Sequence, residues 1–162
     1  MGSAMNEVQR HIDVNCPVST VYNQFTQFEQ FPKFMAGVKQ VHQLDDKTLH
    51  WVIEIGGVRR EFDAKVTEQI PDKRIAWKSI DGKTHAGVVD FHRLSDNQSR
   101  VNLQMAYDPE GFAENAADML GIISNRVQGD LERFKDFIET RGRETGAWRG
   151  EIKAPGESHG RR

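Results

Sequence analysis

The stretch "TLHWVIEIGGVRREFDAKVTEQI", residues 48–70, contains two runs of alternating apolar and polar side chains joined by two consecutive glycines. Alternation with a period of two is typical of β-strands that bury one face. A Gly-Gly pair between two such runs predicts a hairpin with a two-residue turn. In the register that this turn sets, Trp51 faces Phe62 and Ile53 faces Arg60. The stretch therefore predicts an antiparallel pair of strands with one apolar face and one charged face.

The apolar face of the predicted hairpin carries one charged side chain, that of Arg60. Its other members are Leu49, Trp51, Ile53, Ile55, Val58, Phe62, Ala64 and Val66. A charge buried without a partner is costly. The guanidinium therefore reaches the end of the sheet or pairs with a carboxylate such as that of Glu68, or it lies in a cavity and binds a carboxylate, carbonyl or phosphate group of a ligand. The sequence leaves these interpretations open.

Strand patterns lie on both sides of this hairpin. Residues 8–14 alternate in the same way, and between residues 38 and 107 further short runs are separated by the turn sequences "DDK", "PDK", "DGK" and "SDNQS". Such short connections join antiparallel neighbours. We therefore predict seven strands in one mostly antiparallel sheet.

Helical spacing of apolar residues first appears after Pro17, a residue that suits the first turn of a helix. The spacing continues as far as Phe28. Pro32 then disfavours a helical conformation at Phe31. Residues 18–34 therefore predict two short helices instead of one long helix.

A longer apolar stripe, at steps of three and four, begins at Ala116 and ends at Ile138, and Gly142 marks the end of the helix that it predicts. One long helix cannot fill the concave side of a seven-stranded sheet, so we expect a cavity between helix and sheet. Its predicted lining residues are Phe25, Phe28, Phe34, Trp51, Ile53, Phe62, Trp77, Phe91, Leu103, Met105, Met119, Leu120, Ile123 and Val127.

The inward face of residues 84–94 depends on the length of the turn that precedes them. A two-residue turn would direct Ala86 and Val88 inward, whereas a three-residue turn would direct His85 and Phe91 inward, because one residue of slip inverts the pattern. We favour the second register because it places an aromatic ring inside the protein. His85 then becomes a candidate acid or base in the cavity.

Composition argues against several classes of partner and cofactor. The formal net charge is −2 over 162 residues, which argues against nucleic acid, since such a partner requires a clustered basic surface. The single cysteine excludes an intrachain disulfide and favours a reducing cytoplasm. No apolar run approaches the roughly 18 residues of a spanning helix. No metal-ligand motif is present, and we predict no metal and no other cofactor.

The sequence predicts one domain, because a chain of this length buries a single core. We assign residues 1–5 to a cloning remnant and residues 6–142 to the domain. Residues 143–162 have little apolar content, so we expect a flexible C-terminal tail.

Four stretches in a fixed order carry a resemblance to a known family: "VYNQFTQFEQFPKFM", "GVRREFDAKVTEQIPDKRIAWKSIDG", "GVVDFHRL" and "AYDPEG", followed by the long helix. Over residues 8–141 the chain resembles the polyketide cyclase/dehydrase branch of the START-like (SRPBCC) superfamily and its bacterial members. The resemblance implies an α+β helix-grip fold, in which a curved seven-stranded antiparallel sheet wraps around a long C-terminal helix and two short helices follow the first strand. It also implies an apolar cavity for a lipid, polyketide, isoprenoid or similar ligand.

Three functional hypotheses follow. The first is binding of a small hydrophobic ligand in the cavity. The second, which the resemblance to aromatase/cyclases implies, is a cyclase or dehydratase without a metal, in which Arg60, with or without His85, polarises a carbonyl group and moves protons. The third is a module that docks onto a protein or membrane through residues 25–34, if their phenylalanines are exposed together.

The resemblance also gives residues 25–34 a place in the fold, over the mouth of the cavity. We therefore expect Phe25 and Phe28 to belong to the inner wall, and Phe31 and Phe34 to gate access to it.

Overall fold

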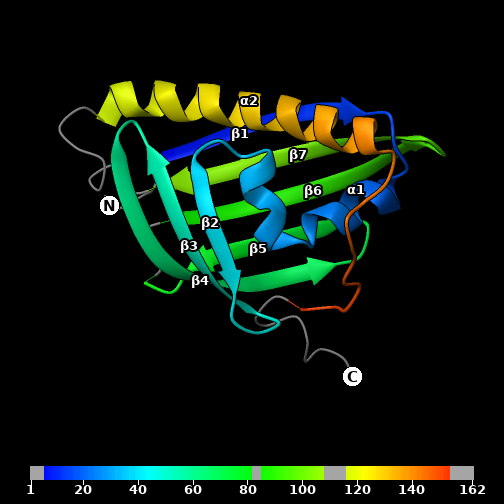
Figure 1. The fold of residues 1–162 in the computed structure, drawn as a ribbon, viewed down its shortest axis with the longest axis horizontal. Helices are drawn as coiled ribbons and strands as arrows, with labels where there is room; N and C mark the ends of the chain where they lie inside the picture. Colours follow the sequence, from blue (N-terminus) through cyan, green and yellow to red (C-terminus); the bar gives the residue numbers. More distant parts are fainter. Residues whose placement is uncertain (1–5, 82–84, 108–115, 154–162) are drawn as a thin grey trace.

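The structure, a computed structural model, describes residues 6–81, 85–107 and 116–153, and the side chains of residues 6, 55, 107 and 116–120 lie outside the description. The strands are β1 (Asn6–Val14), β2 (Val38–Gln43), β3 (Thr48–Ile55), β4 (Val58–Ile70), β5 (Arg74–Ser79), β6 (His85–Ser95) and β7 (Gln98–Tyr107). They form one antiparallel sheet in the order β1-β7-β6-β5-β4-β3-β2. The predicted seven-stranded sheet is confirmed, and Figure 1 shows that it curls strongly.

Two short helices connect β1 to β2. The first is α1 (Val18–Phe25), which Pro17 precedes, and the second is the 3-10 helix η1 (Phe28–Lys33), which contains Pro32. The predicted division into two short helices is therefore confirmed. The long C-terminal helix α2 (Ala116–Arg141) lies along β1 on the concave side of the sheet (Figure 1).

The β3–β4 hairpin has the register that its two glycines predict. Gly56 and Gly57 have backbone φ angles of 60° and 83°, which residues other than glycine rarely adopt. Trp51 consequently pairs with Phe62, and the position opposite Arg60 is Ile53, as the sequence predicts. This local turn decides which side chains of both strands face the interior.

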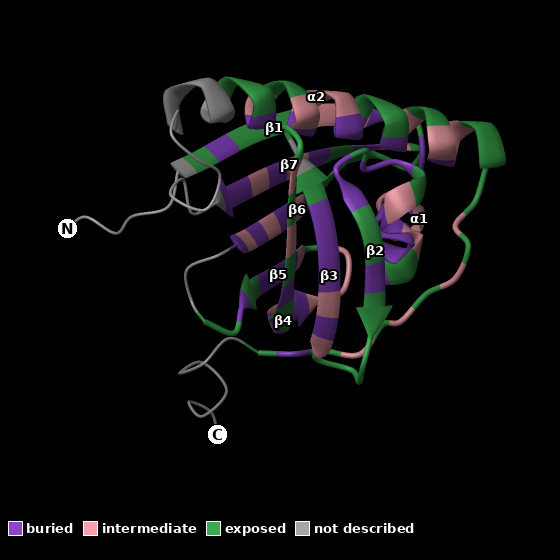
Figure 2. Cartoon of the chain, turned by 60° about the vertical axis from the view of Figure 1, so that its left-hand side comes forward, coloured by how far each residue is buried: buried purple, intermediate pink, exposed green. Residues whose placement is uncertain are grey.

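Burial alternates along the central strands, as the bands of Figure 2 show. On β6, the buried residues include His85, Gly87, Val89 and Phe91, whereas the residues between them are partly exposed. The favoured register of this strand therefore holds, and His85 lies on the inner face of the sheet.

Gly87 allows a close approach between β5 and β6. It is the register partner of Trp77, and a Cβ atom at this position would come 2.6 Å from Cε2 of the indole ring. Because real Cβ contacts are essentially never this short, the Trp77 ring occupies the space that a side chain at position 87 would need. The indole can thus lie flat over the neighbouring strand.

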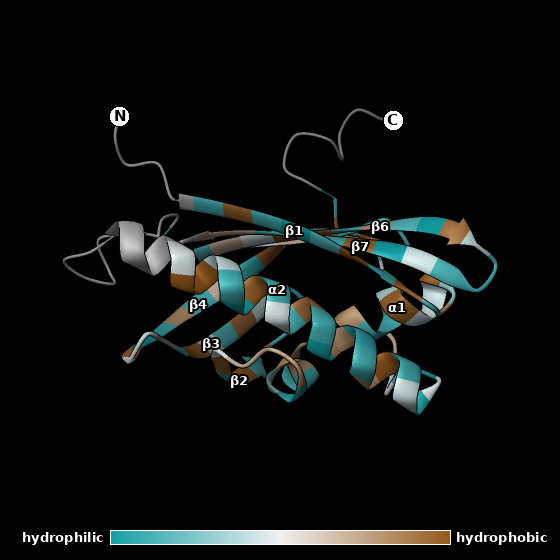
Figure 3. Cartoon of the chain, turned by 90° about the horizontal axis from the view of Figure 1, so that it is seen from above, coloured by the Kyte–Doolittle hydropathy of each residue, from teal (hydrophilic) through white to brown (hydrophobic). Residues whose placement is uncertain are grey.

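The inner side of α2 completes the core. Ile123, Val127, Leu131, Phe134 and Ile138 are all at most 3% exposed. Their spacing of three and four residues places them on one face of the helix, which packs against the sheet. Seen from above, hydrophobic and hydrophilic bands alternate along α2 (Figure 3). The two earlier members of the predicted stripe, at positions 116 and 120, have side chains outside the description.

The segment that follows α2 differs from the sequence-based expectation of a flexible tail. Thr145 exchanges two hydrogen bonds, of 2.9 and 3.0 Å, with the fully buried carboxamide of Gln24. Arg149 forms an ion pair with Asp72, at 2.8 Å. The backbone of Ile152 pairs with that of Gln69 on β4. Residues 143–153 therefore form a strap across α1 and the edge of β4, held by contacts that composition cannot reveal. Residues 154–162 and 1–5 lie outside the described residues.

The close approach at Gly87 makes a testable prediction about stability. Gly87→Ala forces the Trp77 indole or the strand to move, and overpacking of this kind costs about 1–3 kcal/mol in free energy of unfolding. Urea denaturation monitored by tryptophan fluorescence measures the loss. The control is Gly121→Ala on the exposed side of α2, where a Cβ meets no atom within 4 Å. We expect this control to stabilise the protein by up to about 1 kcal/mol. Equal stability of Gly87→Ala and the unmodified protein would contradict the packing argument.

Candidate functional site

A set of stacked aromatic rings forms the inner wall of the sheet. The Trp51 ring on β3 lies 6.1 Å from the Phe62 ring on β4, with an angle of 10° between their planes. On its other side it lies 5.5 Å from Trp77 on β5, at 23°. These rings meet because alternation directs all three toward the interior. They form a buried apolar wall that spans three strands.

The indole N–H groups of this wall are unusual for a protein interior. The Nε1 atoms of Trp51 and Trp77 are both buried, and within the described part of the chain neither has a hydrogen-bond acceptor. A buried donor without an acceptor costs about 1–3 kcal/mol, and most buried polar groups in proteins are satisfied. An oxygen atom supplied at this wall would remove that cost.

His85 lies against the same wall. Its ring centroid is 5.1 Å from that of Phe62 and 5.3 Å from that of Trp51, and the residue is only 1% exposed. Burial lowers the pKa of the imidazole from 6.5 to about 3, because the charged form cannot be solvated there. Its backbone N–H donates to Oγ of Ser79 at 3.1 Å. His85 is therefore a neutral imidazole at physiological pH, whose burial disfavours the protonated form.

Arg60 lies on the inner face of β4 near the Gly56–Gly57 turn of the β3–β4 hairpin, and it is half-buried. The carboxylate that the sequence offers as its partner, Glu68, instead accepts a 2.8 Å hydrogen bond from Nε of Arg74. Arg60 and Phe62 are two residues apart on one strand and so face the same side. The structure thus brings Arg60, Phe62 and His85 to one wall.

The four phenylalanines of residues 25–34 are all buried, at 0–2% exposure. Phe31 lies 5.8 Å from Trp51 and 6.2 Å from Trp77, in the middle of the aromatic wall. The exposed docking patch proposed as the third hypothesis is therefore absent from this segment, because its rings pack inward. Phe31 is fully buried in the core, and gating by this ring stays a prediction.

Phe34 packs against two aromatic rings of the long helix. Its ring centroid is 5.0 Å from that of Phe134 and 5.6 Å from that of Phe137, both on α2. The chain that continues from it, residues 34–37, forms a loop beside the helix, here called the Phe34 loop. Gating by Phe34 stays a prediction.

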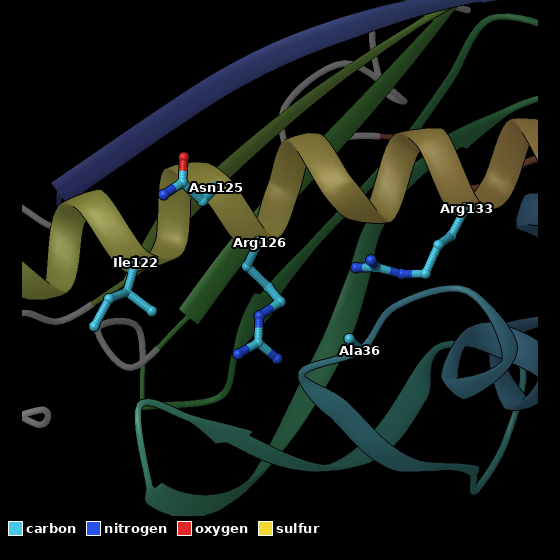
Figure 4. A pocket seen from close by; sticks show the side chains of 5 residues that line it. All are labelled: Ala36, Ile122, Asn125, Arg126 and Arg133. Carbon is cyan, nitrogen blue, oxygen red and sulfur yellow. The ribbon is translucent and has the colours of Figure 1, made fainter.

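A pocket of about 520 Å³ opens between α2 and the Phe34 loop. In Figure 4 the side chains of Ile122, Arg126 and Arg133 extend from α2 on the side of the loop, whereas Asn125 points away from it. The lining residues in the described part of the chain are Ala36, Ile122, Asn125, Arg126 and Arg133. Ile123 and Val127, which the sequence assigns to the cavity wall, are buried next to this row on the side of α2 that faces the sheet.

Asp130 joins the Phe34 loop to α2. Its Oδ1 atom accepts a 2.9 Å hydrogen bond from the backbone N–H of Ala36 and a second from Arg133. Arg133 also donates from Nε to the carbonyl oxygen of Phe34, at 3.1 Å. Burial raises the pKa of the Asp130 carboxyl above its usual range, and these donors oppose the shift. The margin of the pocket is thus set by a carboxylate and a guanidinium on neighbouring turns of α2.

The remaining predicted wall residues lie where the alternation of the strands places them. Phe25 packs against Phe91 and Phe134, with ring centroids 5.6 and 4.5 Å apart. The other buried members on the sheet and in η1 are Phe28, Ile53, Leu103 and Met105. The side chains of Met119 and Leu120 lie outside the described residues. That this set contacts a ligand stays a prediction.

The residues at the margin of the pocket were not among the site residues predicted from the sequence. Ile122, Arg126 and Arg133 recur at helical spacing beside the apolar stripe, which is the one signal that could have indicated it. Among the described residues, no group of three or more His, Cys, Asp or Glu side chains could hold a metal ion. No helix in the same part of the chain is long and apolar enough to cross a membrane.

Comparison with known proteins agrees with this architecture. The family model described as polyketide cyclase/dehydrase and lipid transport matches residues 14–136. The chain belongs to this polyketide cyclase/dehydrase family. A Streptomyces lincolnensis relative, described as an uncharacterised 17.2 kDa protein from the melC2–rnhH intergenic region, is 52% identical over 149 residues, which cover 91% of this chain and 99% of the relative.

Solved structures show the family's fold in more distant relatives. The Zhui aromatase/cyclase from Streptomyces sp. R1128 is similar with a TM-score of 0.71 at 14% identity, over 89% of this chain and 99% of the other. A Deinococcus radiodurans protein gives a TM-score of 0.66 at 25% identity, over 85% and 99%. A START superfamily protein from Mycobacterium smegmatis gives 0.62 at 15%, over 83% and 95%. The helix-grip fold implied by the sequence resemblance is thereby confirmed.

The burial of His85 predicts how the stability of this family member depends on pH. The pKa of His85 is about 3 in the folded protein and 6.5 in an exposed imidazole. As the pH falls below 6.5, the unfolded chain therefore binds a proton on His85 that the folded protein does not bind. The free energy of unfolding therefore decreases from pH 6.5 downward, by about 2 kcal/mol at pH 5. In His85→Phe this part of the decrease disappears.

Urea denaturation at several pH values measures this slope. His92→Phe, which removes an exposed imidazole from the same strand, is the control. An equal slope in His85→Phe and in the unmodified protein would show that His85 is not held neutral.

Proposed function

We propose that this protein binds a small hydrophobic ligand between the sheet and α2. The observation that carries the proposal is the pocket of about 520 Å³ between α2 and the Phe34 loop. Its volume lies within the range of about 300–1,000 Å³ that is usual for small-molecule sites. It borders the buried face of α2, and membership of a family described by both polyketide cyclisation and lipid transport supports this type of ligand.

The aromatic wall supports the same proposal and indicates how a ligand is held. Flat rings on three strands offer a large apolar surface, and burying apolar area contributes about 25 cal/mol for each Å². The buried indole N–H groups of Trp51 and Trp77 offer two donors for a carbonyl or hydroxyl oxygen. The favoured ligand is therefore a mostly apolar molecule that carries oxygen acceptors.

A binding measurement tests the proposal. Nile red, a neutral apolar dye, should bind the purified protein with an increase in fluorescence, and native mass spectrometry should detect any small molecule that co-purifies. Ala36→Trp places a large ring at the exposed margin of the pocket without altering the core, so it should weaken dye binding about tenfold or more.

Lys39→Trp is the matched control, because this exposed position on β2 lies three residues away and outside the pocket lining. Its dye affinity should equal that of the unmodified protein. The proposal fails if the unmodified protein carries no small molecule and binds neither Nile red nor fatty acids, quinones or aromatic polyketides.

Cyclisation or dehydration of a bound polyketide is a second candidate, and the position of His85 favours it. A neutral imidazole beside an aromatic wall suits a hydrogen bond to an oxygen-bearing ligand, and the guanidinium of Arg60 on the same face suits polarisation of a carbonyl group. Incubation with a reactive poly-β-ketone, followed by mass spectrometry, distinguishes catalysis, through loss of water, from binding alone. If Arg60→Gln and His85→Phe bind the substrate and form product at the rate of the unmodified protein, this candidate is excluded.

A further inference from the structure

The pocket beside α2 is lined by two guanidinium groups, and the helix geometry places them together. Ile122, Arg126 and Arg133 are separated by four and seven residues, so they lie on one side of α2. The buried stripe of the helix lies on the adjacent side, toward the sheet. Figure 4 shows both guanidinium groups extending from α2 toward the loop that carries Ala36. Positive charge therefore gathers where the pocket opens beside the core.

The two arginines differ in what they already bind. Arg133 donates to the carbonyl oxygen of Phe34 and to Asp130. A Cβ atom at Gly129 would come 3.0 Å from Nη1 of Arg133, so the glycine leaves room for this guanidinium to lie along the helix. Arg126, in contrast, is half-buried and makes no hydrogen bond or ion pair with any residue that the structure describes. Its five N–H donors are available to a ligand.

Asp130 does not cancel the charge of Arg126. Its Oδ1 atom is occupied by the N–H of Ala36 and by Arg133, and its side chain is buried below the pocket. Arg126 acts on this carboxyl only through space. Counting only the residues that the structure describes, two guanidinium groups and one carboxylate give the pocket margin a net positive charge.

Together these features point to one chemistry. We propose that Arg126 binds an anionic head group of the ligand, a carboxylate or a phosphate monoester, while the apolar body of the ligand extends toward the sheet. The inference rests on the proposed function and deepens it, because it specifies an amphiphile with one acidic end. A guanidinium pairs with carboxylate and phosphate through two parallel hydrogen bonds, which a neutral alcohol cannot reproduce.

The apolar residues beside Arg126 favour an anion that is joined to a hydrophobic body. Ile122 is 39% exposed on the same side of the helix, one turn before Arg126. Ala36 offers a methyl group on the opposite margin. A small inorganic anion would leave these groups in water, whereas the first carbons of an amphiphile would cover them.

The test compares two ligands that differ only in the head group. Dodecanoate and dodecanol each displace Nile red from the unmodified protein, and dodecanoate should bind about tenfold more tightly, as expected for one charge-assisted contact. Arg126→Gln should lower the ratio of dodecanoate to dodecanol affinity about tenfold. Arg126→Lys should restore part of the ratio, since it keeps the charge but loses the bidentate geometry.

Arg141→Gln is the matched control, because it removes an exposed guanidinium from the same helix, about 22 Å further along its axis. This variant should keep the preference of the unmodified protein. Isothermal titration with inorganic phosphate alone distinguishes a free anion from an attached head group, and we expect no Arg126-dependent binding.

Each other outcome has a definite meaning. If Nile red binds but the two ligands displace it equally, and Arg126→Gln changes nothing, the inference is overturned while the proposed function stands. If phosphate alone binds through Arg126 and dodecanoate has no advantage over dodecanol, the attached head group is excluded. If the protein binds neither dye nor amphiphile, both the function and the inference fail.

Discussion

The turn at Gly56 and Gly57 is the constraint on which the rest of the molecule depends. Because side chains alternate along a strand, a slip of one residue would carry Trp51 and Phe62 from the interior to the surface. The two left-handed glycines fix the register, and the apolar face of the hairpin must then be covered. The sheet curls and α2 lies along its concave side, where the stacked rings, η1 and the helix share one core. The candidate site follows from this arrangement, since one helix covers seven strands and a pocket opens at its margin.

The buried polar side chains of this protein are tolerated for different reasons. The imidazole of His85 is buried among aromatic rings and loses its charge, which is why its pKa falls to about 3. The carboxyl of Asp130 is buried too, but it has a structural task, because it accepts the N–H of Ala36 and a guanidinium hydrogen bond. The buried amide of Gln24 is satisfied by Thr145. Within the described residues, the indole N–H groups of the wall lack such partners.

Sequence analysis predicted the elements whose causes are local, and it missed those that depend on distant partners. The register of the β3–β4 hairpin, the break between α1 and η1 at Pro32 and the apolar stripe of α2 each follow from neighbouring residues, and the structure has all three. The inward position of His85 followed from one assumption about a turn. The strap after α2 could not be predicted, because Thr145 and Gln24 are 121 residues apart and nothing in a polar segment reveals its partner. The roles of Asp130 and Arg133 could not be predicted either, because in the sequence they resemble ordinary surface residues of a helix, and their partners in the Phe34 loop are 94 and 99 residues away. The exposed patch inferred from four phenylalanines failed because spacing does not tell which surface covers a ring.

The wall and the margin of the site differ in how they are held, and this difference has a consequence for access. The wall consists of rings stacked across hydrogen-bonded strands, so a local opening there would disrupt both packing and sheet. The margin consists of the Phe34 loop, which Asp130 and Arg133 join to α2 through the N–H of Ala36 and the carbonyl of Phe34. A hydrogen bond to a charged group contributes about 1.5–3 kcal/mol net, and releasing the loop from α2 breaks two such bonds while the hydrogen bonds of the sheet stay intact. Arg133 is bound to the loop and Arg126 is not, although both belong to the same side of the helix. The same row of α2 therefore combines a group that fixes the loop with a group available to a ligand, and a bound anion on Arg126 would lie next to the hydrogen bonds that determine the width of the pocket.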